Sequence, residues 1–465
     1  MLEIPDEEVR SRLEAESPWW AQAHSAGGSL RPRAYLPGLL GLVRDRAVRR
    51  AVVLLGPRRV GKTVLIHHVI EALLAEGVSP REVAYVSVDL PLYSGRSLER
   101  LLALAEQAAG VPLRWAFFDE IQYLPEWERH LKRLVDDRPD LKIVVSGSAA
   151  AALKLKAQES GAGRFTDFLL PPLTFAEYLD LTGAAAPPVR VGPGHDLRVA
   201  DVPALNAAFV DYVNVGGYPE AALNPAVRAD LGRFIKSDIV DKVLLRDLPQ
   251  LYGIGDIQEL NRLFTALAWN TAGEVSVDGL AKRSGVAANT LRKYLEYLEA
   301  AFLIRVVHRV DRNARHFQRA ATFKVYLTNP SLRSALFSPV AAGAEAMGSL
   351  AETAVVSQWF HDPGPIHYAR WADAEVDLVR LGADGRPVGA AEVKWSDRFV
   401  AAPEELKGLV RFAATNGLSR VTATTLTETV QRAVAGVTIQ MMPTSAYAWS
   451  VGEAILMGPA GTVTP

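Results

Sequence analysis

The stretch Gly56-Pro57-Arg58-Arg59-Val60-Gly61-Lys62-Thr63 decides the fold, because it matches the phosphate-binding pattern G-x-x-x-x-G-K-[ST]. An apolar run at residues 51–55 precedes it, and a helical stretch at residues 62–76 follows it. In such a loop the backbone N–H groups and the helix N-terminus surround phosphate oxygens, the lysine contacts the β and γ phosphates, and the threonine ligates Mg²⁺. We therefore expect ATP and Mg²⁺ as cofactors, with nucleotide contacts from Gly56, Pro57, Arg58, Arg59, Val60, Gly61, Lys62, Thr63 and Val64. The alternative is a chance glycine turn before a helix.

Strand-like and helical segments alternate around this loop. Further strands are predicted at residues 83–88, 115–118 and 141–145, with helices at residues 98–109 and 126–136 between them. This alternation predicts an α/β fold in which helices cover both faces of a parallel sheet.

Polar residues follow two of the predicted strands and are candidates for holding Mg²⁺, activating water and contacting the γ-phosphate. Asp119 is expected to hold Mg²⁺ through water, and Glu120 to polarise the attacking water. Ser146 and Ser148 close the next strand, where a hydroxyl can contact the γ-phosphate or the water; a plain Ser-Gly turn is the alternative. Arg164 could act as an arginine finger on a neighbour's γ-phosphate, and a solvated arginine is its alternative. We take Lys62, Asp119, Glu120, Ser146 and Arg164 as the candidate catalytic residues, and Thr63 and Asp119 as the candidate metal ligands.

Several motifs in a fixed order resemble a known family. They are GPRRVGKT (56–63), FFDEIQYLPEW (117–127), VVSGSAA (144–150), LLPPLTFAEYL (169–179) and VNVGGYPEA (213–221). The chain resembles bacterial and archaeal AAA-type ATPases of the AAA+ superfamily that carry a C-terminal domain of unknown function. The resemblance covers residues 30–400 and implies an AAA-type core, a winged helix-turn-helix and a nuclease-like C-terminal fold. It also implies a homo-oligomer, such as a hexameric ring, in which Arg164 acts in trans. Residues 183–196 depart from the family pattern and read as an inserted loop.

Residues 277–303 read as helix, turn and helix. Asp278 can cap a first helix at 279–283, and Asn289 can cap a second helix at 290–300. The start of the second helix would then enter the major groove of DNA, and strand-like residues 304–309 would begin a wing. The DNA-contact candidates are Asn289, Thr290, Arg292 and Lys293. A protein–protein module is the alternative for this segment.

A set of carboxylates and a lysine near the C-terminus resembles the PD-(D/E)XK nuclease core. Asp377 lies on one predicted strand, and Glu392 and Lys394 end the next, where a spacing of two places both on one face. Asp377 and Glu392 could share a Mg²⁺ ion, Lys394 could orient water, and Glu352 could add a ligand. Such a short pattern also arises from surface charge, and nuclease folds also serve as binding domains.

Bulk composition narrows the class of protein. The chain has 465 residues and a formal net charge of -1, so any nucleic-acid contact must come from a local patch. It has 0 cysteines, which excludes disulfides and thiolate metal sites and fits a cytoplasmic location. No apolar run reaches the ~18 residues of a membrane span. We expect an ATPase domain at residues 1–180, a helical winged helix-turn-helix region at 181–338 and a restriction-nuclease-like α/β domain at 339–465.

The leading hypothesis is an oligomeric, Mg²⁺-dependent ATP hydrolase that couples hydrolysis to DNA binding or remodelling. One rival is a nucleotide-gated switch that binds a protein partner. A second rival is a metal-dependent DNA nuclease gated by ATP.

Overall fold

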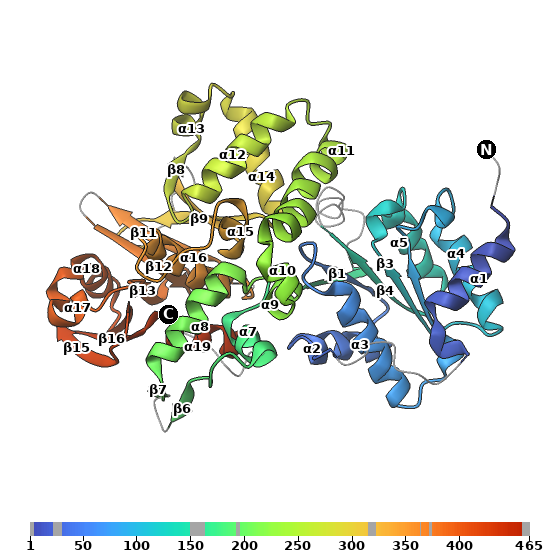
Figure 1. The fold of residues 1–465 in the computed structure, drawn as a ribbon, viewed down its shortest axis with the longest axis horizontal. Helices are drawn as coiled ribbons and strands as arrows, with labels where there is room; N and C mark the ends of the chain where they lie inside the picture. The colour runs from blue at the N-terminus through green and yellow to red at the C-terminus, as the bar shows by residue number, and fades with distance from the viewer. Residues whose placement is uncertain are drawn as a thin grey trace. The chain divides into compact units, whose positions relative to one another are not determined.

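The computed structural model describes residues 4–21, 30–148, 163–191, 196–314, 322–362, 364–371 and 374–457. The chain folds into two compact units, residues 1–171 and residues 172–465 (Figure 1). Each unit contains its own main sheet. The three-domain division at residues 180 and 338 stays a prediction from the sequence.

Unit 1 is built on a fully parallel sheet with the strand order β2-β3-β4-β1-β5. Every residue of β1, β3 and β4 is buried, which requires cover on both faces of the sheet. The carboxyl ends of parallel strands meet at one edge, where the phosphate loop follows β1 and the acidic pair begins with Asp119, the last residue of β3. The predicted parallel α/β fold is confirmed. The strands are β1 (Ala51–Leu55), β2 (Val83–Ser87), β3 (Trp115–Asp119), β4 (Lys142–Gly147) and β5 (Phe165–Leu169).

Strand β5 was not predicted from the sequence. It pairs with β1 over its whole length, from Ala51 opposite Phe165 to Leu55 opposite Leu169. Its side chains are half-buried or exposed, as is usual for an edge strand, so the sequence lacks the apolar run that marked the central strands.

The helices of unit 1 lie between and around these strands. Ser97 caps α4 by accepting the N–H of Arg100, and Gly110 ends it in the left-handed conformation. Trp19 and Trp20 both donate their indole N–H to the carbonyl of Val83, at 2.9 and 2.7 Å, and so fasten the N-terminal segment to β2. The helices are α1 (Asp6–Glu16), η1 (Pro18–Trp20), α2 (Leu36–Arg44), α3 (Lys62–Ala75), η2 (Pro80–Glu82), η3 (Pro91–Tyr93), α4 (Leu98–Ala109), η4 (Ile121–Tyr123) and α5 (Trp127–Asp137).

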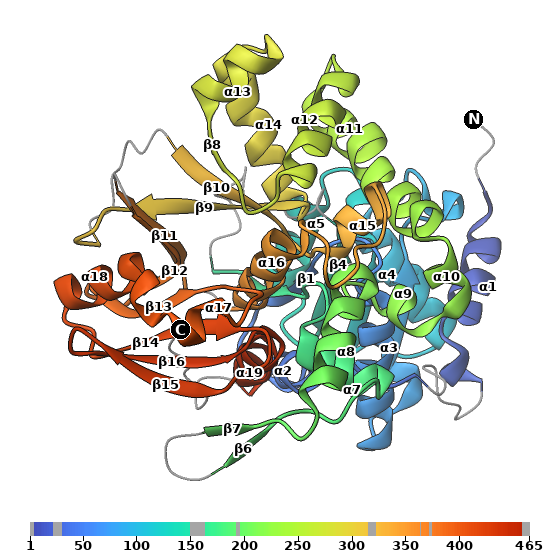
Figure 2. The ribbon, with the colours of Figure 1, turned by 60° about the vertical axis from the view of Figure 1, so that its left-hand side comes forward.

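Unit 2 contains a mixed nine-stranded sheet with the order β15-β16-β14-β13-β12-β11-β9-β10-β8 (Figure 2). It takes strands from both sides of residue 338. The strands are β8 (Glu274–Ser276), β9 (Ile304–Val310), β10 (Thr322–Leu327), β11 (Ile366–Trp371), β12 (Ala374–Leu381), β13 (Pro387–Glu392), β14 (Arg420–Thr425), β15 (Val430–Val434) and β16 (Val437–Pro443).

Two apolar cores cover the two faces of this sheet. One joins α16 and α19 to residues such as Tyr368, Leu378 and Ala391, and the other joins α18 to residues such as Val376 and Val379. A mixed α/β C-terminal region is therefore present. The helices of unit 2 are α7 (Phe175–Thr182), α8 (Val202–Val215), α9 (Pro219–Leu223), α10 (Pro225–Ala229), η6 (Gly232–Asp241), η7 (Val243–Asp247), α11 (Leu248–Tyr252), α12 (Ile257–Trp269), α13 (Val277–Ser284), α14 (Ala288–Ala300), α15 (Ser331–Leu336), α16 (Met347–Trp359), α17 (Arg398–Ala401), η8 (Pro403–Glu405), α18 (Lys407–Asn416) and α19 (Thr444–Leu456).

Three local expectations in unit 2 are wrong. Helix α13 is capped by Ser276, whose hydroxyl accepts the N–H of Gly279, and not by Asp278. Asn289 lies inside α14, where its side-chain oxygen accepts from Arg292, so it does not cap that helix. The predicted loop at 183–196 includes strand residues, because β6 (Val189–Val191) pairs with β7 (Asp196–Arg198).

Candidate active site

The phosphate loop has the backbone conformation that its glycines allow. Gly61 lies in the left-handed region with φ 91° and forms the N-cap of α3, so Lys62 is the first residue of that helix. A Cβ atom added at Gly56 would meet the carbonyl oxygen of Leu170 well inside van der Waals contact. Both glycine positions of the motif are therefore sterically required.

The ammonium group of Lys62 is held by the loop itself. Its Nζ donates to the carbonyls of Gly56 and Pro57, at 3.2 and 2.8 Å. Burial lowers the pKa of Lys62, while the nearby Glu120 and Asp119 act in the opposite direction. Loop carbonyls are weaker partners than phosphate oxygens, so the lysine is placed to exchange them for a triphosphate.

Asp119, at the end of β3, is the centre of a hydrogen-bond network. Its Oδ2 accepts from the hydroxyl of Thr63 at 2.6 Å and from the hydroxyl of Tyr85 at 2.9 Å. Its Oδ1 accepts from the hydroxyl of Ser146 and from the backbone N–H of Glu120, the latter at 3.1 Å. The two metal-ligand candidates Thr63 and Asp119 are thus in direct contact.

The sequence leaves three roles open for Ser146: a contact with the γ-phosphate, a contact with the attacking water, or a plain Ser-Gly turn. In the structure its hydroxyl is bound to Asp119 and positions that carboxylate. Tyr85, on the neighbouring strand β2, was not considered at all. Its contact depends on the pairing of β2 with β3, which no local sequence motif reveals.

Glu120 follows Asp119 in a strained position. Its φ is 56°, a left-handed conformation that is uncommon for a residue with a side chain. The side-chain amide of Gln122 donates to the Glu120 carboxylate, and the Gln122 oxygen accepts the backbone N–H of Ser148 at 3.2 Å. Gln122 therefore links the candidate water activator to the end of β4. Among the described residues, the buried hydroxyl of Ser148 has no hydrogen-bond partner.

Arg33 is a further residue that sequence reasoning missed. It is buried, and its guanidinium donates to the carbonyl of Val60 in the phosphate loop at 2.8 Å and to that of Pro171 at 3.1 Å. The ring of Tyr35 lies under this guanidinium, with the cation 5.4 Å from the ring centre. The segment before β1 thus supports the loop from outside the motif.

Arg164 lies at the edge of the sheet opposite to the phosphate loop. Its carbonyl accepts the N–H of Ala51 at the start of β1, and its side chain forms an ion pair with Asp136 at 2.8 Å. The five residues of β1 separate the two edges by roughly 16 Å, at about 3.3 Å per residue. Arg164 cannot serve the phosphate loop of its own chain, and a finger role requires a second copy.

Replacing Tyr85 by phenylalanine tests the Asp119 network. The change removes one of the two donors to Asp119 Oδ2, and we expect kcat for ATP to fall about 3- to 10-fold, which corresponds to about 1 kcal/mol. The Mg²⁺ concentration that gives half-maximal activity should rise as well. The matched control is Tyr123→Phe, at an exposed tyrosine of the same unit. Equal effects of the two changes on Mg²⁺ dependence would exclude Tyr85 from the network.

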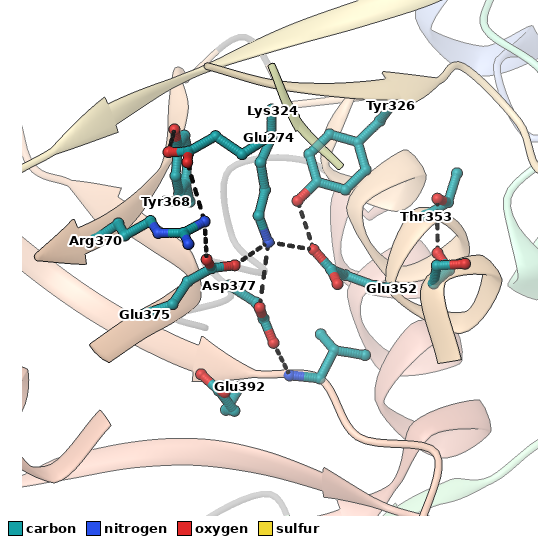
Figure 3. Close-up of polar contacts among 12 residues, drawn as sticks. Glu274, Lys324, Tyr326, Glu352, Thr353, Tyr368, Arg370, Glu375, Asp377 and Glu392 are labelled. Atoms are coloured by element: carbon teal, nitrogen blue, oxygen red, sulfur yellow. Dashed lines mark hydrogen bonds and ion pairs between the residues drawn. The ribbon is translucent and has the colours of Figure 1, made fainter. Parts of the chain in front are cut away.

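The nuclease-like residues of unit 2 do come together. Glu352 on α16, Asp377 on β12 and Glu392 at the end of β13 converge on one site (Figure 3). The ammonium group of Lys394, two residues after the end of β13, contacts Asp377 and Glu392. Lys394 Nζ lies 2.8 Å from Glu392 Oε1 and 3.6 Å from Asp377 Oδ2. Lys324, which no sequence motif indicates, also contacts this site through an ion pair with Glu352. We call the group of Lys324, Glu352, Glu375, Asp377, Glu392 and Lys394 the acid–lysine cluster.

Burial and mutual charge shift the titration of this cluster. Desolvation, together with the charge of Asp377, raises the pKa of Glu352 to about 7 and that of Glu392 to about 8. Burial acts on Asp377 too, but Lys324 and Lys394 outweigh it and hold the pKa of Asp377 below its usual value. Burial and the charge of Asp377 thus favour the protonated form of both Glu352 and Glu392.

The candidate DNA-contact residues share one accessible face of α14. Asn289, Arg292 and Lys293 are exposed and Thr290 is half-buried. Lys282 and Arg283, at the end of α13, are exposed as well, so four cations lie near the turn between the two helices. Arg315, which follows the strand-like residues 304–309 that are predicted to begin the wing, lies outside the described residues.

Two family models match parts of the chain. Residues 48–179 match the model described as AAA domain, and residues 206–343 match the Domain of unknown function (DUF8612). The first match contains the phosphate loop, Asp119 and Glu120. With the parallel sheet, it defines an AAA-type, phosphate-loop ATPase-like domain.

Three similar proteins are described only as uncharacterised proteins. One from Haemophilus influenzae is 25% identical over 292 residues, which is 60% of this chain and 68% of that protein. One from Methanocaldococcus jannaschii is 24% identical over 258 residues, 54% of this chain and 55% of that protein. One from Mycobacterium tuberculosis is 28% identical over 358 residues, 74% of this chain and 70% of that protein.

Solved structures show only a weak likeness. The Aeropyrum pernix Orc1 protein in complex with DNA has a TM-score of 0.30 at 14% identity, covering 69% of this chain and 96% of that one. The Saccharomyces cerevisiae Hsp104–ADP complex also has a TM-score of 0.30, at 16% identity, covering 59% of this chain and 40% of that one. Likeness at this level carries no functional conclusion.

Two features are absent from the part of the chain that the structure describes. No helix in the described part of the chain is both long and apolar enough to cross a membrane. Within the same residues, no three His, Cys, Asp or Glu side chains are placed so that together they could hold a metal ion. The absence of a metal-binding group concerns the metal site that was expected at Glu352, Asp377 and Glu392. It does not bear on the phosphate loop, where a Mg²⁺ ion needs only one or two protein ligands beside phosphate and water.

Proposed function

We propose that this protein is an oligomeric, Mg²⁺-dependent ATPase that couples ATP hydrolysis to DNA binding or remodelling. The observation that carries the ATPase part is the contact between Thr63 on the phosphate loop and Asp119 on β3, with Glu120 next to it. A chance glycine turn would not bring a hydroxyl and an acidic residue 56 positions apart to 2.6 Å.

Each of these residues has one task in the proposed reaction. Lys62 leaves the carbonyls of Gly56 and Pro57 and binds phosphate oxygens, which adds positive charge where negative charge develops. Thr63 and Asp119 would hold Mg²⁺, which when bound neutralises charge on the phosphates. Glu120 accepts a proton from the attacking water, and Gln122 orients the Glu120 carboxylate.

Oligomerisation is part of the proposal because of where Arg164 lies. It cannot reach the phosphate loop of its own chain, so an arginine finger must come from a neighbouring copy. The ion pair with Asp136 would then hold Arg164 at the surface that meets the neighbour.

DNA binding is supported by the exposed start of α14. The cations Lys282, Arg283, Arg292 and Lys293 can neutralise phosphates, and Asn289 can contact a base edge. We propose that α13, α14 and the β9–β10 hairpin act together as a winged helix-turn-helix.

The double change Arg292→Ala with Lys293→Ala tests this assignment. We expect affinity for duplex DNA to fall about 10-fold or more and the slope of log K against log[salt] to decrease by about 2, because two phosphate contacts are lost. Fluorescence anisotropy over a salt series measures both. The control removes the same charge from exposed positions of α18, through Lys407→Ala with Arg411→Ala. Equal DNA affinity and salt slope for the two double variants would contradict the assignment.

A further inference from the structure

The acid–lysine cluster of unit 2 does not fit the divalent metal that a nuclease-like fold implies, and the reason is Lys324. This residue lies in the middle of β10 with its side chain only 4% exposed. Its Nζ is 2.8 Å from Glu352 Oε1, 2.5 Å from Glu375 Oε1 and 3.3 Å from Asp377 Oδ1 (Figure 3). An ammonium group has three N–H donors, and here each is directed at a different carboxylate.

Several carboxylate oxygens of the cluster have further donors. Tyr326, two residues along β10 and on the same face, donates to Glu352 Oε1 at 2.7 Å. Asp377 Oδ2 accepts the backbone N–H of Val393 at 2.9 Å and lies 3.6 Å from Lys394 Nζ. Among the described residues, Glu392 Oε2 is the buried carboxylate oxygen of the cluster without a hydrogen-bond partner. One such atom does not make a metal site.

A divalent ion would compete with ammonium groups that are already in place. Mg²⁺ binds carboxylate oxygens at about 2.1 Å, so an ion that shared oxygens with Lys324 would lie within roughly 5 Å of Nζ. Two cations this close in a buried place repel each other strongly. A divalent ion bound between Asp377 and Glu392 would be repelled in the same way by Lys394. The Nζ of Lys394 lies 3.6 Å from Asp377 Oδ2 and 2.8 Å from Glu392 Oε1.

We propose that Lys324 is the resident cation of this cluster, and that the cluster fastens β10 to α16 and β12 instead of binding a catalytic metal. Lys324 and Tyr326 supply the β10 side of the contact, Glu352 the α16 side, and Glu375 and Asp377 the β12 side. The nuclease-like sheet of unit 2 accordingly serves as a rigid platform and does not cleave phosphodiesters. This inference is independent of ATP binding, and either proposal can fail without the other.

The first test is metal binding by the full-length protein without nucleotide. Asp119→Asn is introduced throughout so that the nucleotide site loses its carboxylate metal ligand and keeps only the hydroxyl of Thr63, and Mn²⁺ is titrated by electron paramagnetic resonance after removal of metals with a chelator. We expect no Mn²⁺ site with a Kd below about 1 mM, and supercoiled plasmid should stay intact in Mn²⁺ or Mg²⁺. Stoichiometric Mn²⁺ binding that disappears in Glu392→Gln, or plasmid cleavage that disappears in Lys394→Ala, overturns the proposal.

The second test removes the resident cation. In Lys324→Met three carboxylates lose their shared ammonium group, and we expect the melting temperature to fall by about 5 °C or more without metal. Recovery of part of this loss on addition of Mn²⁺ would support the idea that ion and ammonium use the same oxygens. Lys407→Met, at an exposed lysine of the same unit, should change neither the melting temperature without metal nor its response to Mn²⁺. A Lys324→Met protein as stable as wild type contradicts the proposal, and if this variant does not fold, the Mn²⁺ titration of the first test decides alone.

Discussion

Replacing Glu120 by glutamine should lower kcat for ATP hydrolysis by about 10²- to 10⁴-fold, the usual contribution of a general base. Glutamine keeps the size and the backbone of Glu120 but cannot accept the proton of the attacking water. The backbone N–H of this residue, which donates to Asp119, is unaffected. ATP affinity should therefore stay within about threefold of wild type, because the contacts with phosphate come from other residues.

The matched control for this change is Glu126→Gln. Glu126 lies six residues further on, is also in the left-handed conformation with φ 51°, and is exposed and paired with Arg129. Loss of a surface ion pair of this kind changes little. A Glu120→Gln protein that turns over ATP as fast as the Glu126→Gln control would remove Glu120 from the catalytic role.

Replacing Lys62 by alanine should weaken triphosphate binding by about 10- to 100-fold. A charge-assisted hydrogen bond contributes about 1.5–3 kcal/mol, and Lys62 is a buried cation that belongs to the loop itself. The effect should be large for ATP and smaller for AMP, which lacks the β and γ phosphates. Equilibrium binding of a fluorescent ATP analogue measures it.

Lys132→Ala, on α5 of the same unit, controls for the loss of a lysine. The melting temperature of Lys62→Ala without nucleotide shows whether the loop still folds once the contacts with Gly56 and Pro57 are gone. ATP affinity equal to that of the Lys132→Ala control would contradict the phosphate-loop assignment.

The sequence predicts the central strands and the phosphate loop of unit 1 well, because each of them is encoded within one short segment of the chain. The glycines of the phosphate loop and the apolar runs before Gly56 and Asp119 reflect steric and burial requirements of single segments. The Tyr85–Asp119 hydrogen bond could not be predicted in this way, since it depends on which strands are neighbours. The contact between Arg33 and Val60 likewise joins segments that are 27 residues apart.

In unit 2, one sequence feature could have predicted the acid–lysine cluster. The run from Thr322 to Leu327 is a short apolar strand with a single charge, Lys324, near its centre. A buried cation requires partners of opposite charge, so this position predicts a nearby carboxylate group. The sequence does not show which carboxylates pair with Lys324, because Glu352 and Asp377 are 28 and 53 residues away along the chain.

The most direct test of the central claim is phosphate release by the wild-type protein with ATP and Mg²⁺, measured with and without duplex, branched and single-stranded DNA. We predict turnover that requires Mg²⁺, is lost in Glu120→Gln, and rises in the presence of at least one form of DNA at low salt. Turnover well below one per minute that no form of DNA changes would contradict the proposal and favour a nucleotide-gated switch for a protein partner.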